Sequence, residues 1–213
     1  MQRSAVSTFE LLVKPIIPRV ADQLGAGRTV IQGYFLSITN LDSANDPQSF
    51  EPLTLNLKFT AISPNFTVAN VVAFWDTTGA DIPVEGTASV VLNTSELNFK
   101  LTLNRRDTGL FILQPNIANL DLVTAANLEL RGYVEISLGA NASSADLILT
   151  PEHRGTFLPV GFQIPRPGSV PPTRSDFDHL VNALPLVGGN SLFQLRKVRR
   201  AAVDEAVLGR VIN

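Results

Sequence analysis

The chain has 213 residues, 45% of them hydrophobic, so it is long enough to bury a core without covalent or metal cross-links. Its formal net charge of −2 excludes the strongly basic surface that gathers nucleic acid or an anionic membrane. It contains no cysteine, which excludes disulfides, cysteine-ligated metal centres and thiol nucleophiles.

Residues 1–28 are expected to form an N-terminal arm with a short helix. Val6, Phe9 and Val13 fall at helical spacing, and the two prolines that follow them prevent one long helix. Such a short helix is not stable alone, so we expect its apolar side chains to pack on another surface. No stretch has the unbroken apolar run of a signal peptide or a transmembrane helix, and we expect a soluble protein in the cytoplasm.

Residues 29–158 are predicted to form an antiparallel β-sandwich domain. Apolar and polar residues alternate over Leu128–Leu138, and the same alternation recurs over residues 97–103 and 55–59. Strands with one apolar face and one polar face indicate an antiparallel sheet that is exposed to water on one side. Short strands separated by turn-forming residues are typical of a sandwich and are compatible with a jelly-roll strand order.

Three further segments are more apolar on both faces: Val30–Ile38, Val68–Trp75 and Ala88–Leu92. We interpret them either as central strands or as strands whose outer face meets another chain. Asp76–Gly79 has the composition of a turn. A second loop ends at Gly109, which we expect to adopt a positive φ.

The C-terminal part changes in character twice. Residues 159–174 are predicted to be an extended connector, because closely spaced prolines block both helix and central strand. Residues 175–213 are predicted to be helical. Ser175 is the expected N-cap of a first helix, and Ser191 that of a second helix running to about Leu208.

Two histidines are available for acid–base chemistry. His153 follows Glu152 in a segment that we expect to be a surface turn, and no nucleophile stands at a recognisable spacing from it. His179 is interpreted as a solvated residue in the first turn of a helix. We therefore assign no catalytic residue and no cofactor, and expect the protein not to be an enzyme.

Two loops contain the oxygen ligands that calcium prefers. Asp42, Asn45 and Asp46 lie in one loop, and Asp76 and Asp81 lie in the other. Aspartate and asparagine are also the usual turn-forming residues, and we prefer that interpretation. No metal ligand is assigned.

Tyr34, Trp75 and Tyr133 are the aromatic residues that combine a ring with a polar group, as sugar sites require. The chain has one Trp and two Tyr against twelve Phe, a set that favours cores and dry interfaces. We therefore interpret Trp75 as an anchor in the core or at a strand end.

A basic cluster spans Arg196–Arg200 within the second predicted helix. Acidic residues follow it closely and weaken the local field, so we interpret it as a solvated or inter-subunit helix face. We expect no nucleic-acid partner.

Two functions are compatible with these features. In the first, the protein is structural and acts by association, either with itself as a homo-oligomer that exchanges its terminal arms or with another protein. In the second, the sandwich binds a carbohydrate or another small molecule through loops at one end, with Trp75, Asp76 and Asp81 as the first contacts.

Overall fold

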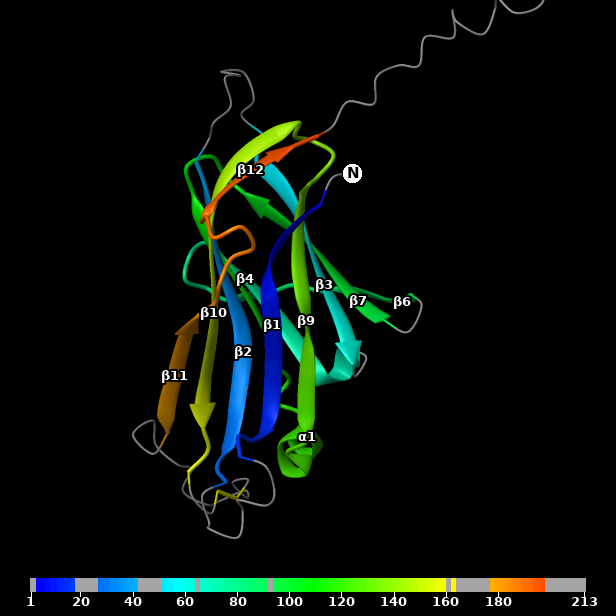
Figure 1. The fold of residues 1–213 in the computed structure, drawn as a ribbon, viewed down its shortest axis with the longest axis vertical. Coiled ribbons are helices and arrows are strands. Elements are labelled where there is room, and N and C mark those ends of the chain that lie inside the picture. The colour runs from blue at the N-terminus through cyan, green and yellow to red at the C-terminus, as the bar shows by residue number, and fades with distance from the viewer. Residues whose placement is uncertain are drawn as a thin grey trace, which may run out of the picture.

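The structure is a computed structural model that describes residues 3–17, 27–41, 51–63, 66–91, 94–159, 162–163 and 177–197. These residues form a mainly antiparallel β fold, a curled sheet in the shape of a half-barrel with one short α-helix at one end (Figure 1). Neither that helix nor the 3₁₀ turn in the described ranges is long and apolar enough to cross a membrane. The strands are β1 (Ser4–Pro15), β2 (Thr29–Asn40), β3 (Leu53–Ser63), β4 (Val71–Asp76), β5 (Ile82–Pro83), β6 (Thr87–Val91), β7 (Thr94–Leu103), β8 (Thr108–Pro115), β9 (Leu128–Leu138), β10 (Ser144–Phe157), β11 (Asp178–Ala183) and β12 (Leu192–Arg196), and the helix is α1 (Leu120–Ala125).

The sheet divides at strand β2. Its path runs β5-β4-β8-β2-β1-β9-β3-β7-β6, while β10 pairs with β2 and carries β11 and β12. One edge of β2 is covered by β10, and the other is shared between β1 at residues 29–32 and β8 at residues 34–39. The division therefore falls at Gly33, where a Cβ atom would lie 2.9 Å from the Cβ of Gln114. It produces two limbs, which we call the first limb (β10-β2-β8-β4-β5) and the second limb (β1-β9-β3-β7-β6).

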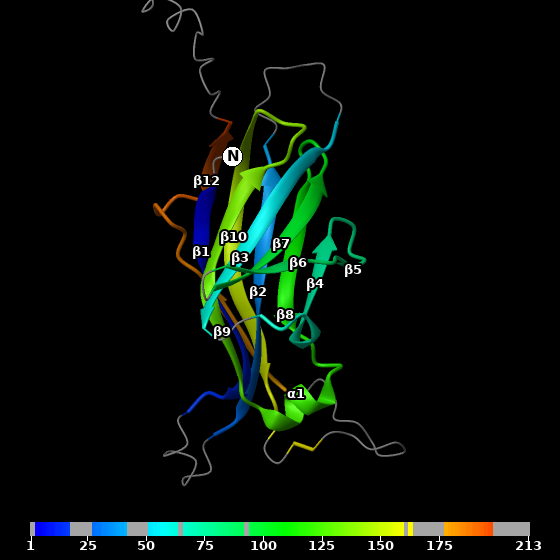
Figure 2. The ribbon, with the colours of Figure 1, turned by 90° about the vertical axis from the view of Figure 1, so that its right-hand side faces the viewer.

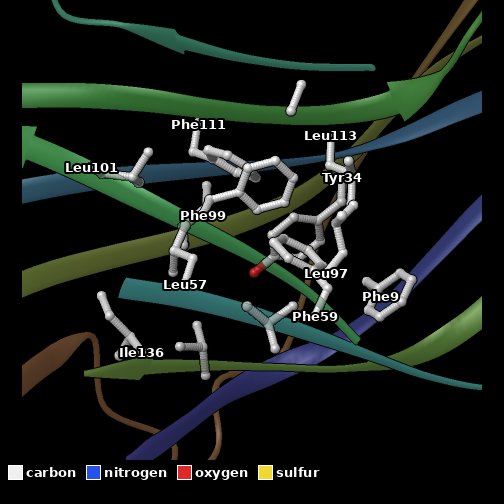
Figure 3. Close-up of a cluster of buried hydrophobic side chains, with 14 of the residues drawn as sticks. Phe9, Tyr34, Leu57, Phe59, Leu97, Phe99, Leu101, Phe111, Leu113 and Ile136 are labelled. Atoms are coloured by element: carbon white, nitrogen blue, oxygen red, sulfur yellow. The ribbon is translucent and has the colours of Figure 1, made fainter. Parts of the chain in front are cut away.

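The core lies between the two limbs. Phe59 of β3 is its centre, with ring centroids 5.3 Å from Phe9, 5.4 Å from Tyr34, 5.9 Å from Phe99 and 5.6 Å from Phe111. These rings belong to β1, β2, β3, β7 and β8, and Figure 3 shows them converging, with leucines around them. Aromatic pairs at these separations add to the stabilisation from burial alone, so the curled sheet closes over a dry interior.

The three alternating segments are confirmed as strands β3, β7 and β9. Their leucines, valines and phenylalanines face the core, and their polar residues face outward. The coarser fold prediction, mainly antiparallel β, is therefore correct. The sandwich and the jelly-roll order are not confirmed, because the described strands are hydrogen-bonded into one continuous curled sheet.

The prediction of an N-terminal helical arm is wrong for the described residues, because Ser4–Pro15 is strand β1 and lies between β2 and β9. Phe9, Leu11 and Val13 alternate with a period of two and are buried. A β-bulge between Ala5 and Ser7 shifts the phase, so that Val6 is also buried. The bulge thus gave the buried positions the spacing of a helix. Residues 18–26, the rest of the predicted helical turn, lie outside the described residues.

The predicted C-terminal helices are also wrong where the chain is described. Residues 178–183 form β11 and residues 192–196 form β12, and both pair antiparallel with the long strand β10. Local capping and periodicity favoured helices, but the free edge of β10 offers both segments a ladder of backbone hydrogen bonds. Ser175, most of the proline-rich connector, and residues 198–213 lie outside the described ranges.

Two turn predictions had different outcomes. Asp76–Gly79 is a turn, and Gly79 has a φ of 85°. Gly109 does not have a positive φ; in its loop that conformation belongs to Arg106, at 53°. Gly109 lies in β8 beneath the indole of Trp75, where a Cβ atom would lie 2.1 Å from the ring. Close packing, rather than backbone conformation, requires glycine there.

Candidate functional site

A polar groove of about 700 Å³ lies on the outer face of the second limb. Antiparallel pairing of β3 with β7 and β9 brings polar side chains from three strands into register on this face. Its floor consists of two cross-strand rows, Asn98–Lys58–Glu135 and Lys100–Asn56–Ser137. The groove is therefore built on paired strands, which hold side chains more rigidly than loops do.

The ends of the groove come from neighbouring segments. At one end, the turn after β9 folds against the start of β3: the Gly139 N–H donates to the Thr54 carbonyl at 2.7 Å. Asn141 fixes the same turn, because its Oδ1 accepts from the Thr54 N–H at 3.2 Å and its Nδ2 donates to the Pro52 carbonyl at 2.7 Å. A side chain at Gly139 would meet Thr54, with Cβ 2.5 Å from Cγ2. The absence of that side chain lets the turn close the groove.

Lys58 is the most buried charge in the groove, with 8% of its surface exposed. Its Nζ lies 3.1 Å from Glu96 Oε1 and 2.7 Å from Glu135 Oε2. Burial lowers the pKa of Lys58, hydrogen bonds to Glu135 and Glu96 raise it, and the net shift is upward. Lys58 is therefore a fixed cation compensated by two carboxylates, and its ammonium is already engaged.

Three other charged side chains of the groove, Arg3, Lys100 and Glu85, make no hydrogen bond or ion pair within the described part of the chain. Their charged ends are consequently available to a ligand. Three cations (Arg3, Lys58, Lys100) stand beside three carboxylates (Glu85, Glu135 and the Glu96 that binds Lys58). The groove is thus rich in charged side chains, and its cations are balanced in number only when Glu96, the partner of Lys58, is counted with the two lining carboxylates.

A second, apolar space of about 420 Å³ lies at the seam of the half-barrel, between β4 and β7. We call it the seam slot. Its walls are Val71–Phe74, the segment Pro83–Gly86, Leu97, Phe99 and Leu113. The segment between β5 and β6 passes from the first limb to the second (Figure 2), and the Val84 N–H holds it by donating to the Ala73 carbonyl at 3.0 Å. Glu85 and Phe99 line both the seam slot and the polar groove, so the two spaces adjoin there.

The three aromatic residues considered as sugar ligands lie outside both spaces. Tyr34 is fully buried, and its hydroxyl lies 2.9 Å from the Ser7 hydroxyl. Trp75 is half-buried, and its Nε1–H donates to the Thr102 carbonyl at 3.0 Å, which ties β4 to β7. Tyr133 is 37% exposed on the outer face of β9 but does not line the groove. The geometry of Trp75 is that of a strand-end anchor.

The acidic residues at the end of β4 and just after it, Asp76 and Asp81, take part in a turn. Asp76 Oδ1 accepts backbone hydrogen bonds from Thr78 at 2.9 Å and from Ala80 at 3.1 Å. These bonds, led by that from Thr78, hold the pKa of Asp76 below its ordinary value. Asp81 contributes its backbone N–H and has a φ of 44°. No three acidic or histidine side chains of the described residues are grouped to hold a metal; Asp42, Asn45 and Asp46 lie outside those residues.

Glu152 and His153 do not form a surface turn, because both belong to β10 and point to opposite faces of the sheet. Glu152 pairs with Arg154 at 2.8 Å. His153 Nε2 accepts the Glu10 N–H at 3.0 Å, where β1 has separated from β2 and that amide has no strand partner. Burial lowers the pKa of His153, and the Glu10 carboxylate opposes this shift. The neutral imidazole of His153 thus lies where β1 and β2 separate and supplies the hydrogen bond that strand pairing no longer gives to Glu10.

The basic cluster is not a helix face in its described part. Arg196 ends β12, and its guanidinium lies 2.7 Å from Asp146. Lys197 Nζ donates to the Ala140 carbonyl at 2.9 Å, which fastens β12 to the turn at the end of the groove. Arg199 and Arg200 lie outside the described residues. His179, expected in a helix, is exposed on β11.

Sequence reasoning did not find the groove, although it identified the polar faces of the three strands that form it. The missing information was the strand order, because a polar outward face becomes a site only when its neighbours are known. Comparisons with known protein families, with curated proteins and with solved structures found no match to this chain.

Proposed function

We propose that the protein is a non-enzymatic ligand-binding β domain whose site is the polar groove. The observation that supports this proposal is that Arg3, Lys100 and Glu85, which have no hydrogen-bond or ion-pair partner among the described residues, stand beside a floor of amides and hydroxyls on paired strands. Small-molecule sites are concavities of this size with a few converging polar groups. Neither described histidine lines the groove, and its buried lysine is engaged by two carboxylates, so the groups present suit binding better than proton transfer.

Titration of isotope-labelled protein with maltose and with glycerophosphocholine tests this proposal. We expect amide shift changes concentrated in β3, β7, β9 and the turn at residues 139–141. Lys100→Ala and Asn56→Ala should each weaken binding about tenfold, since each removes a group facing the ligand. Arg154→Ala, which removes one positive charge on the first limb, should leave the affinity unchanged. No shift changes with either probe, or changes spread over both limbs, would contradict the proposal.

A second candidate function, association of identical chains, is supported by β11. This six-residue strand pairs with β10 on one edge and with no other described strand, and Val181 is 62% exposed on it. It contains no lysine, arginine or proline, the residues that usually protect an edge from pairing. The central position of β1 removes the N-terminal support for exchanged arms, so the edge of β11 is the surface that we propose for association.

Light scattering during size-exclusion chromatography tests this second candidate. We expect the native chain to dimerise. Val181→Lys should raise the dissociation constant of the dimer at least tenfold, because a charged side chain disfavours edge pairing. Val187→Lys is the control, since Val187 is similarly exposed, at 58%, but lies outside the strand. A native chain that stays monomeric at the highest attainable concentration would reject association.

A further inference from the structure

The groove and the seam slot meet at two residues, Glu85 and Phe99. The groove lies on the outer face of β7 and the seam slot on its core-facing side. A ligand in the groove therefore reaches this apolar space of about 420 Å³ past the edge of β7 at Phe99, next to Asn98, the last residue that pairs with β6. Ala73, Leu97 and Leu113 point apolar surface into that space. An apolar space of this kind gains more from an apolar occupant than from water, which would find few hydrogen-bond partners there.

Resting on the proposed function of the groove, we infer that the ligand is a single-chain amphiphile whose head group has no net charge. Its alkyl chain enters the seam slot between β4 and β7, and its head group lies over Lys58, Asn56 and Lys100. The charges of the groove suggest the class of head group. Three cations and two carboxylates line it, and Glu96, which binds Lys58, balances the count, so the groove offers partners of both signs to a head group without net charge. Both a polyhydroxylated head and a zwitterionic head meet this requirement.

The experiment measures binding by the fluorescence of Trp75, the single tryptophan, which follows the slot residue Phe74. The amphiphilic probes are octyl maltoside, decyl maltoside and decylphosphocholine, each kept below its micelle concentration. Maltose and glycerophosphocholine represent the head groups alone, and decanoate represents an anionic head. We expect saturable binding of one amphiphile per chain, with affinity rising about fourfold for each added methylene.

Two variants test whether the alkyl chain of the ligand lies in the seam slot. Val84→Phe fills the slot from the segment that crosses the seam, and Ala73→Leu fills it from β4. Each should reduce the affinity for decyl maltoside and decylphosphocholine at least tenfold, while leaving the binding of the head groups alone within a factor of two. Val187→Phe is the matched control, because it adds the same volume at an exposed valine outside the slot. Near-ultraviolet circular dichroism shows whether each variant is folded. If one of the two variants fails to fold, the other still tests the placement of the alkyl chain.

The outcomes separate this inference from the function on which it rests. Tight binding of either neutral-head probe, lost in both slot variants, supports it and identifies the head group as a sugar or a zwitterion. Equal affinity for maltose and decyl maltoside would overturn the inference and leave the groove as a site for polar ligands. Binding of decanoate tenfold tighter than that of both neutral-head probes would overturn the assignment of the head group. Unchanged binding in both slot variants would overturn the placement of the chain. Absence of binding by every probe would overturn both proposals.

Discussion

Replacing Gly132 by alanine should destabilise the protein by about 3 kcal/mol or more, among the largest effects expected of one methyl group. Gly132 lies in β9 between Phe9 of β1 and Ala61 of β3. A Cβ atom there would lie 1.8 Å from the Thr60 carbonyl oxygen and 2.9 Å from Cε1 of Phe9. The obstacle is backbone in the middle of the sheet, which no rotamer change relieves, so two central strands would have to separate.

Urea unfolding of Gly132→Ala and Gly33→Ala measures this effect. Gly33 is the control, because it also lies in a central strand but its Cβ would approach Gln114 Cβ no closer than 2.9 Å. Both substitutions reduce the entropy of the unfolded chain equally, so the difference between them isolates the steric conflict. We expect about 1 kcal/mol of destabilisation for Gly33→Ala. Equal unfolding midpoints for the two variants would show that β9 and β3 are not packed as described.

Replacing Lys58 by methionine should cost about 3 kcal/mol at neutral pH, since it leaves two carboxylates beside each other without their cation. Lys58 joins Glu96 and Glu135 with only 8% of its surface exposed. The comparable exposed pair is Lys14–Glu129, where 37% of the lysine side chain is accessible. Lys14→Met should therefore cost less than about 1 kcal/mol. Chemical unfolding of the two variants compares a buried and a surface ion pair on the same sheet face.

The pH dependence of the Lys58 effect has a definite sign. The folded-state pKa of Lys58 is raised above its ordinary value of 10.5, so its contribution is complete below that pH and is lost as the pH rises through the folded-state value. The difference in stability between the native protein and Lys58→Met should thus be fully present at neutral pH and should shrink as the pH rises above about 10. A difference independent of pH would mean that lost packing, and not lost charge, causes the destabilisation.

A triple variant separates the two charged partners from the lysine itself. Lys58→Met combined with Glu96→Gln and Glu135→Gln removes all three charges while keeping side chains of similar size. We expect most of the lost stability to return, because the cost lies in uncompensated carboxylates rather than in the missing ion pair. A triple variant as unstable as Lys58→Met would assign the cost to the shape of the lysine chain.

The sequence alone determined which residues face inward on the regular strands. Over residues 55–59 of β3, 97–103 of β7 and 128–138 of β9, the inward and outward positions keep a period of two, because neighbouring side chains on a strand point to opposite faces. The alternation therefore predicted both the core leucines and the polar face that later proved to carry the groove. The residue composition also predicted the turn at Asp76–Gly79. This turn is local, because the Asp76 carboxylate accepts the Thr78 N–H and Gly79 supplies the positive φ.

Interactions between distant segments were decided only by the tertiary structure. The bulge in β1 gave a strand the apolar spacing of a helix. β11 and β12 are strands because β10, whose paired residues stand 21 to 52 positions earlier in the chain, offers them a free edge. The groove depends on the same kind of information. Lys58, Glu96 and Glu135 come from three strands far apart in sequence, and only the order β9-β3-β7 brings their charges together. Side-chain alternation is local and can be read from sequence, whereas strand order depends on which backbone edges meet, and no local pattern encodes that choice.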